Sequence, residues 1–442
     1  MRNAGEQTKP GARLGWLDVV RGIAAISVVF QHLTSTLLHR PFDVVHRHLD
    51  LGLYGVVAFF LVSGYIVPAS LERRGDVRGF WIGRLFRLYP VCILVYVGAI
   101  AVLGPLHAGG VAPAVYSHPV LTSFGNATML EDLLGSYNGL SVMWTLTYEM
   151  IFYYLVTALF VFGWERRSAP IATGLGLTAL VLGPVLPGYL LLHAYGATAL
   201  TSVAVVVMVI GLAGLLSGRR RLMRAAAVLL AVQALLLVFL NSRSTGWETL
   251  LILGTMFCGT AIYRAEQGQI RPRWAWTAAV TVLVAGVVTA ALFNTGRTTW
   301  RTWTYGPMAW YLAFVAAWLT FGIAMLLRRR RMPAALTWLG RISYSTYLLH
   351  VPLIAAMWLV IAHTARPVGT VQQLLWMVGF FVVLLTLSQL TYRYVELPMQ
   401  KLGRRVAHGR LGRSPTPPDD PGGPRIPVQI PAGDEERAGA AG

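Results

Sequence analysis

LDVVRGIAAISVVFQH, residues 17–32, places two ionisable side chains in an apolar run that is long enough to cross a membrane. Arg21 and His32 are 11 positions apart, so they return to nearly one helical face, about 16 Å apart along the axis. A charged side chain in lipid costs roughly 3 kcal/mol on insertion scales and normally faces a protein interior or a polar cavity. The stretch therefore predicts a transmembrane helix that forms one wall of a site.

The composition predicts a membrane protein along the whole chain. Of the 442 residues, 55% are hydrophobic and 12% are charged, and the mean hydropathy is +0.58. Apolar runs of about 20 residues recur, which is the length of a transmembrane helix. We expect an all-α, polytopic transmembrane helical bundle in the plasma or inner membrane, in contact with membrane lipids. The net charge of +19 comes from short Arg clusters between the apolar runs, which is a topology signal and not a sign of nucleic-acid binding.

Twelve stretches are candidate spans. They are residues 17–38, 51–70, 88–107, 142–163, 170–187, 198–217, 225–241, 249–263, 275–293, 305–327, 342–364 and 371–392. The stretches 225–241 and 249–263 are short, and a tilted or re-entrant arrangement of both is the alternative. The expected number is therefore 10 to 12.

Arginine is distributed unequally between the connections. Those after even-numbered spans carry 19 Arg, and those on the other side carry six. The excess of positive charge predicts that both termini are cytoplasmic. We expect a cytoplasmic segment at 1–13 without a removable signal peptide, a transmembrane domain at 14–402, and a disordered Pro/Gly-rich cytoplasmic tail at 403–442.

Five further segments follow the first helix. They read AFFLVSGYI (58–66), RLFRLYP (84–90), WTLTYEMIFYY (144–154), GRISYSTYLLHVPL (340–353) and YRYVELP (392–398). In this order they closely resemble the acyltransferase-3 family of bacterial membrane O-acyltransferases, over roughly residues 14–400. The resemblance implies transfer of an acyl group, often acetyl, from cytoplasmic acyl-CoA to a sugar hydroxyl in a surface glycan or a glycosylated metabolite. Most members have ten core helices, and no appended extracytoplasmic domain follows here, so we expect a stand-alone transferase.

Two residues are the candidates for catalysis. Transfer from a thioester to an alcohol needs a base, donors for the developing oxyanion, and cations for the CoA phosphates. His32 is the candidate base, and Glu149 is expected at a similar depth, where a carboxylate orients an imidazole. The alternatives are a core histidine bonded to a neighbouring helix and a carboxylate that pairs with Arg21 for assembly.

Three arginines are candidates for binding the acyl donor. Arg21 lies on the His32 face, although a local pair with Asp18 is the alternative. Arg84 and Arg87 are three positions apart beside the membrane and suit phosphate groups, although any cytoplasmic Arg also serves as a topological anchor. We expect acyl-CoA, with acetyl as the leading acyl group, to be a co-substrate, with no permanently bound cofactor and no metal.

Polar residues at helical spacing are the remaining candidates for lining the site. Gly340, Ser343, Tyr347 and His350 form one stripe, with His350 expected nearer the inner leaflet than His32; helix-to-helix packing is the alternative. The quoted segments add Ser63, Tyr65, Trp144 and Tyr344 to the expected binding residues. A multi-span secondary transporter is the alternative function, because transporters also hold polar residues within the membrane.

Overall fold

The structure is a computed structural model that describes residues 15–409 apart from 107–109, 244–245, 296–303, 305, 365–366 and 368. The expected N-terminal segment 1–13 and the tail beyond residue 409 lie outside these residues. The described part of the chain is helical, and its only β pairing is an isolated bridge between Gly188 and Ser242. The predicted all-α class is confirmed.

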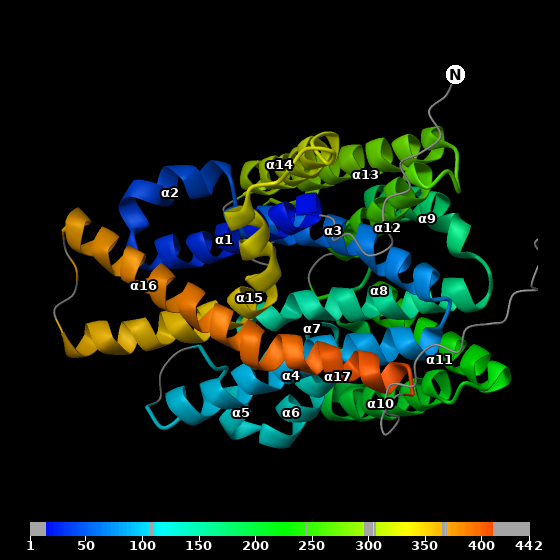
Figure 1. Ribbon diagram of the computed structural model, residues 1–442, viewed down its shortest axis with the longest axis horizontal. Coiled ribbons are helices and arrows are strands. Elements are labelled where there is room, and N and C mark those ends of the chain that lie inside the picture. Colours follow the sequence, from blue (N-terminus) through cyan, green and yellow to red (C-terminus); the bar gives the residue numbers. More distant parts are fainter. Residues whose placement is uncertain are drawn as a thin grey trace, which may run out of the picture.

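Figure 1 labels the helices along the chain. Their bounds are α1 (Gly15–Leu37), α2 (His39–His48), α3 (Leu51–Arg74), α4 (Val77–Leu103), α5 (Ala114–Ser117), α6 (Pro119–Thr128), α7 (Glu131–Leu134), α8 (Trp144–Val161), α9 (Ser168–Val181), α10 (Leu190–Leu216), α11 (Arg220–Leu240), α12 (Gly246–Glu266), α13 (Pro272–Phe293), α14 (Pro307–Leu326), α15 (Ala334–His363), α16 (Thr370–Thr391) and α17 (Leu397–Ala407). Short helical turns precede α8 (Ser141–Met143) and α9 (Glu165–Arg167), and a π-helical turn (Tyr392–Glu396) joins α16 to α17.

Ten helical segments of the described chain are long and apolar enough to cross a membrane. The chain is thus a multi-pass membrane protein, and ten is the lower of the two predicted numbers. Of the two doubtful stretches, 225–241 belongs to α11, which meets the criteria because the helix starts earlier, at Arg220. Two of the twelve predicted spans correspond to α9 and α12, which do not meet the criteria for a membrane-crossing helix. Helix α9 has only 14 residues.

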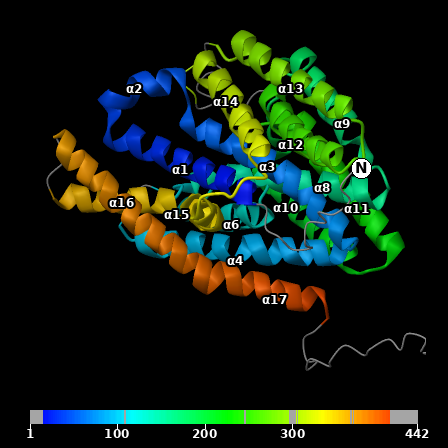
Figure 2. The same ribbon diagram turned by 45° about the horizontal axis from the view of Figure 1, so that its top comes forward.

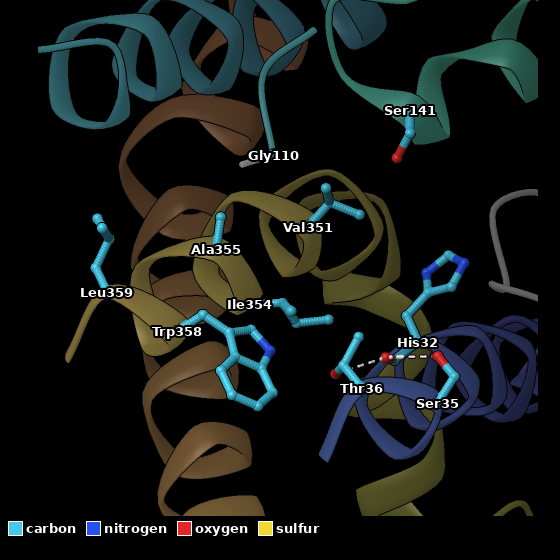
Figure 3. Close-up of a pocket in the computed structure, with 10 residues that line it drawn as sticks. All are labelled: His32, Ser35, Thr36, Gly110, Ser141, Val351, Ile354, Ala355, Trp358 and Leu359. Atoms are coloured by element: carbon cyan, nitrogen blue, oxygen red, sulfur yellow. Dashed lines mark hydrogen bonds between the residues drawn. The ribbon is translucent and has the colours of Figure 1, made fainter. Parts of the chain in front are cut away.

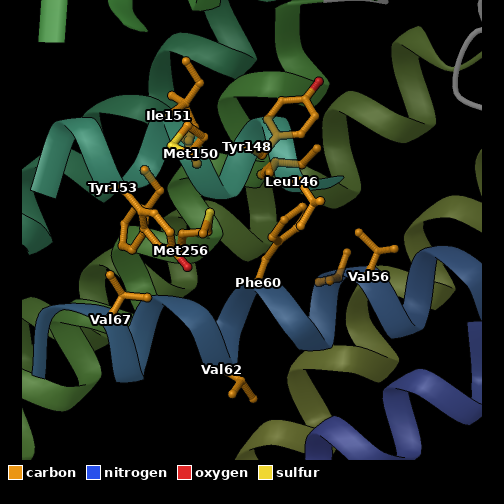
Figure 4. Close-up of a cluster of buried hydrophobic side chains, with 14 of the residues drawn as sticks. Val56, Phe60, Val62, Val67, Leu146, Tyr148, Met150, Ile151, Tyr153 and Met256 are labelled. Atoms are coloured by element: carbon orange, nitrogen blue, oxygen red, sulfur yellow. The ribbon is translucent and has the colours of Figure 1, made fainter. Parts of the chain in front are cut away.

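Helix α12 is less apolar because it is surrounded by protein. All residues from Gly246 to Ala261 are buried, and the helix packs against α3, α9 and α13. A helix that does not face lipid can keep small and polar residues on every side. Figure 4 shows the adjoining core, in which Phe60 of α3 and Tyr148 of α8 meet edge to face, 6.1 Å between ring centroids; Met256 of α12 is labelled in the same cluster.

Helices α1 and α15 run in the same direction and touch along much of their length. Glycines allow the close approach: a Cβ at Gly340 would collide with the carbonyl of Asp18, and one at Gly22 with the backbone of Leu336 and Gly340. His32 lies 17 residues after Gly15, where α1 starts, and His350 lies 16 residues after Ala334, where α15 starts. Parallel packing from these two starts therefore brings the histidines to one depth.

The described chain begins and ends at one end of the bundle, called here the terminal end, and the opposite end is the far end. Trp16 packs against Tyr65 near the close of α3, with 5.4 Å between ring centroids, and Ala407 lies beside Gly79 at the following start of α4. Figure 2 shows α16 and α17 extending along the outside of the bundle. Helix α17 continues to Ala407, so its last five residues fall in the segment 403–442 that was expected to be disordered.

Candidate active site

The centre of the candidate site is a pair of histidines on α1 and α15. His32 Nδ1 lies 2.8 Å from His350 Nε2, and the two rings are nearly coplanar. The expectation that His350 lies nearer the inner leaflet is therefore wrong. That expectation assumed that the last-but-one span starts at residue 342. Helix α15 begins at Ala334 instead, so His350 lies about two turns further from the start of its span than expected.

The hydrogen bonds fix which ring nitrogens carry protons when both rings are neutral. His350 Nδ1 lies 2.6 Å from the carbonyl oxygen of Tyr347, and since a carbonyl only accepts, Nδ1 must donate. His350 Nε2 then has a lone pair and accepts from His32 Nδ1. His32 Nε2 is left with a lone pair, as a general base requires.

His32 lines a cavity of about 620 Å³ at the far end of the bundle, called here the wide cavity. This volume lies in the range of about 300–1,000 Å³ that is usual for ligand pockets. Much of its wall is polar and comes from α1 and from the connections before α3, α8, α12 and α14. The polar and aromatic lining includes Gln31, Ser35, Asp50, Asn138, Ser141, Trp144, Arg243, Glu248, Thr304 and Tyr347.

A second, much narrower cavity of about 70 Å³ lies toward the terminal end and is called here the channel. Eight of its lining residues are ionisable or hydroxylic: Arg21, Ser63, Arg87, Thr145, Glu149, Ser343, Tyr344 and Tyr347. Tyr347 and Val56 line both the channel and the wide cavity. The two cavities thus adjoin at Tyr347, one turn of α15 before His350.

A third cavity is an apolar groove of about 490 Å³ beside His32. Figure 3 shows His32, Ser35 and Thr36 of α1 on one side, with a row of side chains from Val351 to Leu359 along α15. His32, Ser35 and Ser141 line both this groove and the wide cavity. His32 therefore lies where a polar and an apolar space meet.

Glu149 is in the site, but it is not the partner of His32. Its Oε1 accepts hydrogen bonds from Ser63 Oγ, at 3.4 Å, and from the Tyr153 hydroxyl. Helix α1 packs against α3 and α15, and α8 lies beyond α3, so the described contacts of His32 do not include this carboxylate. The described side chain that contacts the His32 ring nitrogen is His350 instead.

The two arginines of α4 occupy different surroundings. Arg87 lines the channel, whereas Arg84 is 7% exposed, donates to Ser70 Oγ at 3.0 Å, and lies over the rings of Phe80 and Tyr153. They do not form the expected cationic fork. Spacing of three positions places two residues on one broad face, but it does not decide which of them reaches a cavity.

The other expected residues are divided between the cavities. Ser343 and Tyr344 line the channel, and the Tyr344 hydroxyl donates to the Leu88 carbonyl at 2.8 Å. Trp144, expected as a binding residue for substrate or donor, lines the wide cavity. The Tyr65 hydroxyl donates to Glu266, and its ring packs on Trp16 and Tyr263, outside the three cavities described here.

Sequence reasoning missed much of the wide cavity. Asp50, Asn138, Arg243 and Glu248 come from connections or first helical turns, where charged residues are ordinary and carry no signal of a site. Asp50 caps α3 and accepts from the Leu53 N–H at 2.8 Å. Burial raises the pKa of Asp50 to about 6 in spite of its backbone hydrogen bonds. Among the described residues, no three His, Cys, Asp or Glu side chains gather as a metal site.

The fold and the site together define a multi-pass membrane protein with a paired-histidine centre, in which His32 lines both the wide cavity and the apolar groove. The family model described as "Acyltransferase domain" matches residues 14–393. The chain therefore belongs to the acyltransferase-3 family, and the resemblance of its motifs is confirmed.

Several curated proteins are similar over shorter stretches. "Nodulation protein 10" of Rhizobium leguminosarum bv. viciae is 29% identical over 183 residues, which are 37% of this chain and 50% of that protein. "Putative peptidoglycan O-acetyltransferase YrhL" of Bacillus subtilis is 25% identical over 38% of this chain and 28% of its own length. A "Putative O-acetyltransferase" of Staphylococcus aureus (strain COL) is 32% identical over 20% of this chain and 14% of its own length. These matches span at most half of the relatives' lengths, and no solved structure matches the chain.

Proposed function

We propose that the protein is a membrane O-acyltransferase that moves an acyl group, with acetyl as the leading candidate, from cytoplasmic acyl-CoA to a hydroxyl of a carbohydrate. The acceptor belongs to a surface glycan or to a glycosylated metabolite. The observation that carries the proposal is the arrangement of the channel and the wide cavity, which adjoin at Tyr347 beside the histidine pair. Family membership favours acyl transfer over the alternative of a secondary transporter.

The channel suits the donor. Its small volume excludes a nucleotide, so in this proposal the nucleotide of CoA stays at the terminal end and only the acyl end of the donor approaches the histidines. Arg21 and Arg87 supply positive charge along the approach, which attracts the anionic phosphates. We take the terminal end to be cytoplasmic, where acyl-CoA is found, because basic clusters lie around it and positive charge is enriched on the cytoplasmic side of membrane proteins.

The wide cavity suits the acceptor, and His32 links the two substrates. As the acceptor oxygen attacks the thioester carbonyl, His32 Nε2 takes the hydroxyl proton and the new C–O bond forms. The C–S bond then breaks, and the proton passes to the departing thiolate to give CoA-SH. His350 holds the His32 ring in the required tautomer through the Nδ1 hydrogen bond.

Cleavage of the donor by purified protein tests this proposal without knowledge of the acceptor. In lipid nanodiscs, wild-type protein should release thiol from acetyl-CoA by slow transfer to water. His32→Ala should lower the release rate by roughly 10²- to 10⁴-fold, since a positioned base is lost. Equal rates of thiol release by the two proteins, both correctly inserted, would show that His32 serves packing and is not the base.

A further inference from the structure

The apolar groove beside His32 continues the line of the channel along α15. Tyr347 is the last residue of α15 that lines the channel, and Val351, one turn later, is the first that lines the groove. The lining positions recur every three or four residues as far as Leu359, so they share one face of the helix. His350 lies between the two sets and contacts His32 there. A donor that comes through the channel therefore meets the histidine pair first and the groove next.

The wall of the groove is hydrocarbon over most of its length. On α1, the hydroxyls of Ser35 and Thr36 both donate to the carbonyl of His32 at 3.0 Å, so they are directed to their own helix (Figure 3). The side chains from α15 are apolar apart from one indole N–H, and they are Val351, Ile354, Ala355, Trp358 and Leu359. His32 and Ser141 belong to the end that the groove shares with the wide cavity. The groove is thus polar beside His32 and apolar beyond it.

Packing holds the walls of the groove in place. Ile354 belongs to the apolar cluster that joins α15 to α1 and α16, and Trp358 packs against this cluster. On another side, a Cβ at Gly110 would lie 2.7 Å from the Cβ of Ala355, so the connection after α4 already touches α15. The helix rises about 12 Å over residues 351–359, which is room for an extended chain of roughly eight carbons.

The proposed reaction leaves one substituent of the reacting carbonyl without a place in the channel or the wide cavity. The carbonyl carbon lies beside His32 Nε2, with its sulfur toward the channel and the attacking oxygen in the wide cavity. Its third substituent is the acyl chain, which is hydrocarbon. The groove is the third cavity at this point and is apolar, so it can remove the chain from water.

We propose that the groove receives the acyl chain of the donor, and that the protein transfers apolar acyl groups of roughly four to eight carbons in preference to acetyl. This inference rests on the proposed function, because it concerns the acyl group of that reaction and changes its preferred length. Each methylene that becomes buried should raise kcat/KM by about fourfold at most. The tail of a membrane lipid is the other occupant that the experiments below can reveal.

A series of donors measures the length of the groove. Acetyl-, butyryl-, hexanoyl- and octanoyl-CoA would be compared by thiol release in nanodiscs, and kcat/KM should be about tenfold or more higher for hexanoyl-CoA than for acetyl-CoA. Ala355→Leu fills the middle of the groove and should lower the hexanoyl-to-acetyl ratio. Leu359→Trp fills the distal end and should lower the octanoyl-to-butyryl ratio.

The matched control for these variants is Val360→Trp. Val360 follows Leu359 on α15, but it is 52% exposed and is not among the residues that line the groove. Both ratios should therefore stay at their wild-type values. A general loss of folded protein lowers the rates for all donors together and cancels in the ratios.

Photocrosslinking locates the chain without any acyl transfer. The probe is a thioether analogue of hexanoyl-CoA, which cannot be cleaved, with a diazirine at the end of the chain. In wild-type protein we expect mass spectrometry to find the label on residues 351–359, and an excess of CoA should prevent labelling. A phosphatidylcholine with a diazirine in its tail, placed in the nanodisc, tests the membrane lipid as occupant.

Several results would overturn the inference. These are a kcat/KM that does not rise with chain length, ratios that change equally in the groove variants and in Val360→Trp, a CoA-sensitive label outside the groove, and no CoA-sensitive label. Labelling of the groove by the phosphatidylcholine that hexanoyl-CoA does not prevent would assign the groove to a lipid tail instead. Absent thioester cleavage for every donor, with the label still in the groove, would contradict the proposed function and leave the chain-binding site established.

Discussion

At the scale of single residues, the chemistry of the candidate site depends on one hydrogen bond between two rings. His32 has no carboxylate among its described contacts, and its orientation comes from His350, which is itself anchored by the Tyr347 carbonyl. A relay of this kind leaves the base neutral and keeps its free nitrogen available. We propose that His350 is a positioning residue, and Glu149 lies elsewhere, in the channel with Ser63.

Substitution of His350 tests the positioning role. His350→Ala removes the acceptor for His32 Nδ1–H, so we expect kcat to fall by roughly 10²-fold, at the lower end of the effect of losing a base. His350→Gln restores an acceptor oxygen and should recover part of that rate. Equal losses in the two variants, at equal thermal stability, would show that His350 serves packing only.

The two arginines of α4 give a matched pair of variants. Arg87→Gln should raise the KM for acetyl-CoA by about tenfold or more, because a charged hydrogen-bonding group in the channel is lost. Arg84→Gln should instead lower the thermal midpoint in detergent, because Arg84 is buried against Ser70 and two rings. A KM effect confined to Arg84→Gln would contradict this placement of the two side chains.

At the scale of helices, the depth of the histidine pair is set by the crossing of α1 and α15. Gly22 and Gly340 face each other there, and the parallel course of the helices carries this close approach to His32 and His350. The site is therefore sensitive to a change more than two helical turns away from the histidines.

A single methyl group at the crossing should separate these helices. Gly340→Ala would push its Cβ into the Asp18 carbonyl, and we expect a loss of about 1–3 kcal/mol of stability together with reduced thioester cleavage. Gly379→Ala on α16, where nothing lies within 4 Å, is the matched control and should be neutral. Unchanged cleavage in Gly340→Ala would mean that the crossing does not set the geometry of the site.

The first turn of α3 should show a pH-dependent stability. The pKa of Asp50 is raised from 3.8 to about 6 by burial, so folding takes up a proton between these values and the free energy of unfolding falls as pH rises through this window. Asparagine caps a helix as well as aspartate does, without the charge. The thermal midpoint of Asp50→Asn should therefore exceed that of the wild type above pH 6 and approach it near pH 4; a constant difference would contradict the assignment.

Much of the fold was predictable because hydrophobic periodicity and length act locally. The stretch 17–38 became α1, and the family motifs fell on α3, α4, α8 and α15. Local patterns could not fix the start of α15 at Ala334, because its first turns at the membrane surface are less apolar. The assumed later start of this helix led to the wrong depth for His350. The wide cavity was missed for another reason: Asp50 and Arg243 meet only through tertiary packing of connections that look ordinary in sequence.

At the scale of the whole molecule, the channel and the wide cavity lie toward opposite ends of one bundle. The described chain starts and finishes at the terminal end, and Arg-rich connections gather there, including Arg219–Arg221 and Arg328–Arg331. The two ends of the described chain lie on one side whether ten or twelve helices cross, because α9 and α12 change the number together, whereas the side of the Arg219–Arg221 connection depends on α9 crossing. The proposed orientation puts the donor in the cytoplasm and the acceptor on the other side.

Reporter tags can check the orientation. Cysteines placed after Ser217 and after Ala407 should both react with impermeant reagents only from the cytoplasmic side, as the excess of positive charge requires. A cysteine at Ser117 should react from the opposite side. Labelling of the Ala407 position from outside would reverse the assignment of donor and acceptor ends.

Transfer across sided membrane vesicles is the most direct test of the account. Impermeant radiolabelled acetyl-CoA would be added to inside-out and right-side-out vesicles from cells that carry the natural acceptor, and mild-alkali-labile ester would be counted. We predict ester only in inside-out vesicles, located in their lumen, and none with His32→Ala. Ester formed equally from either side, or retained in inserted His32→Ala protein, would contradict transfer through the channel to an acceptor activated by His32.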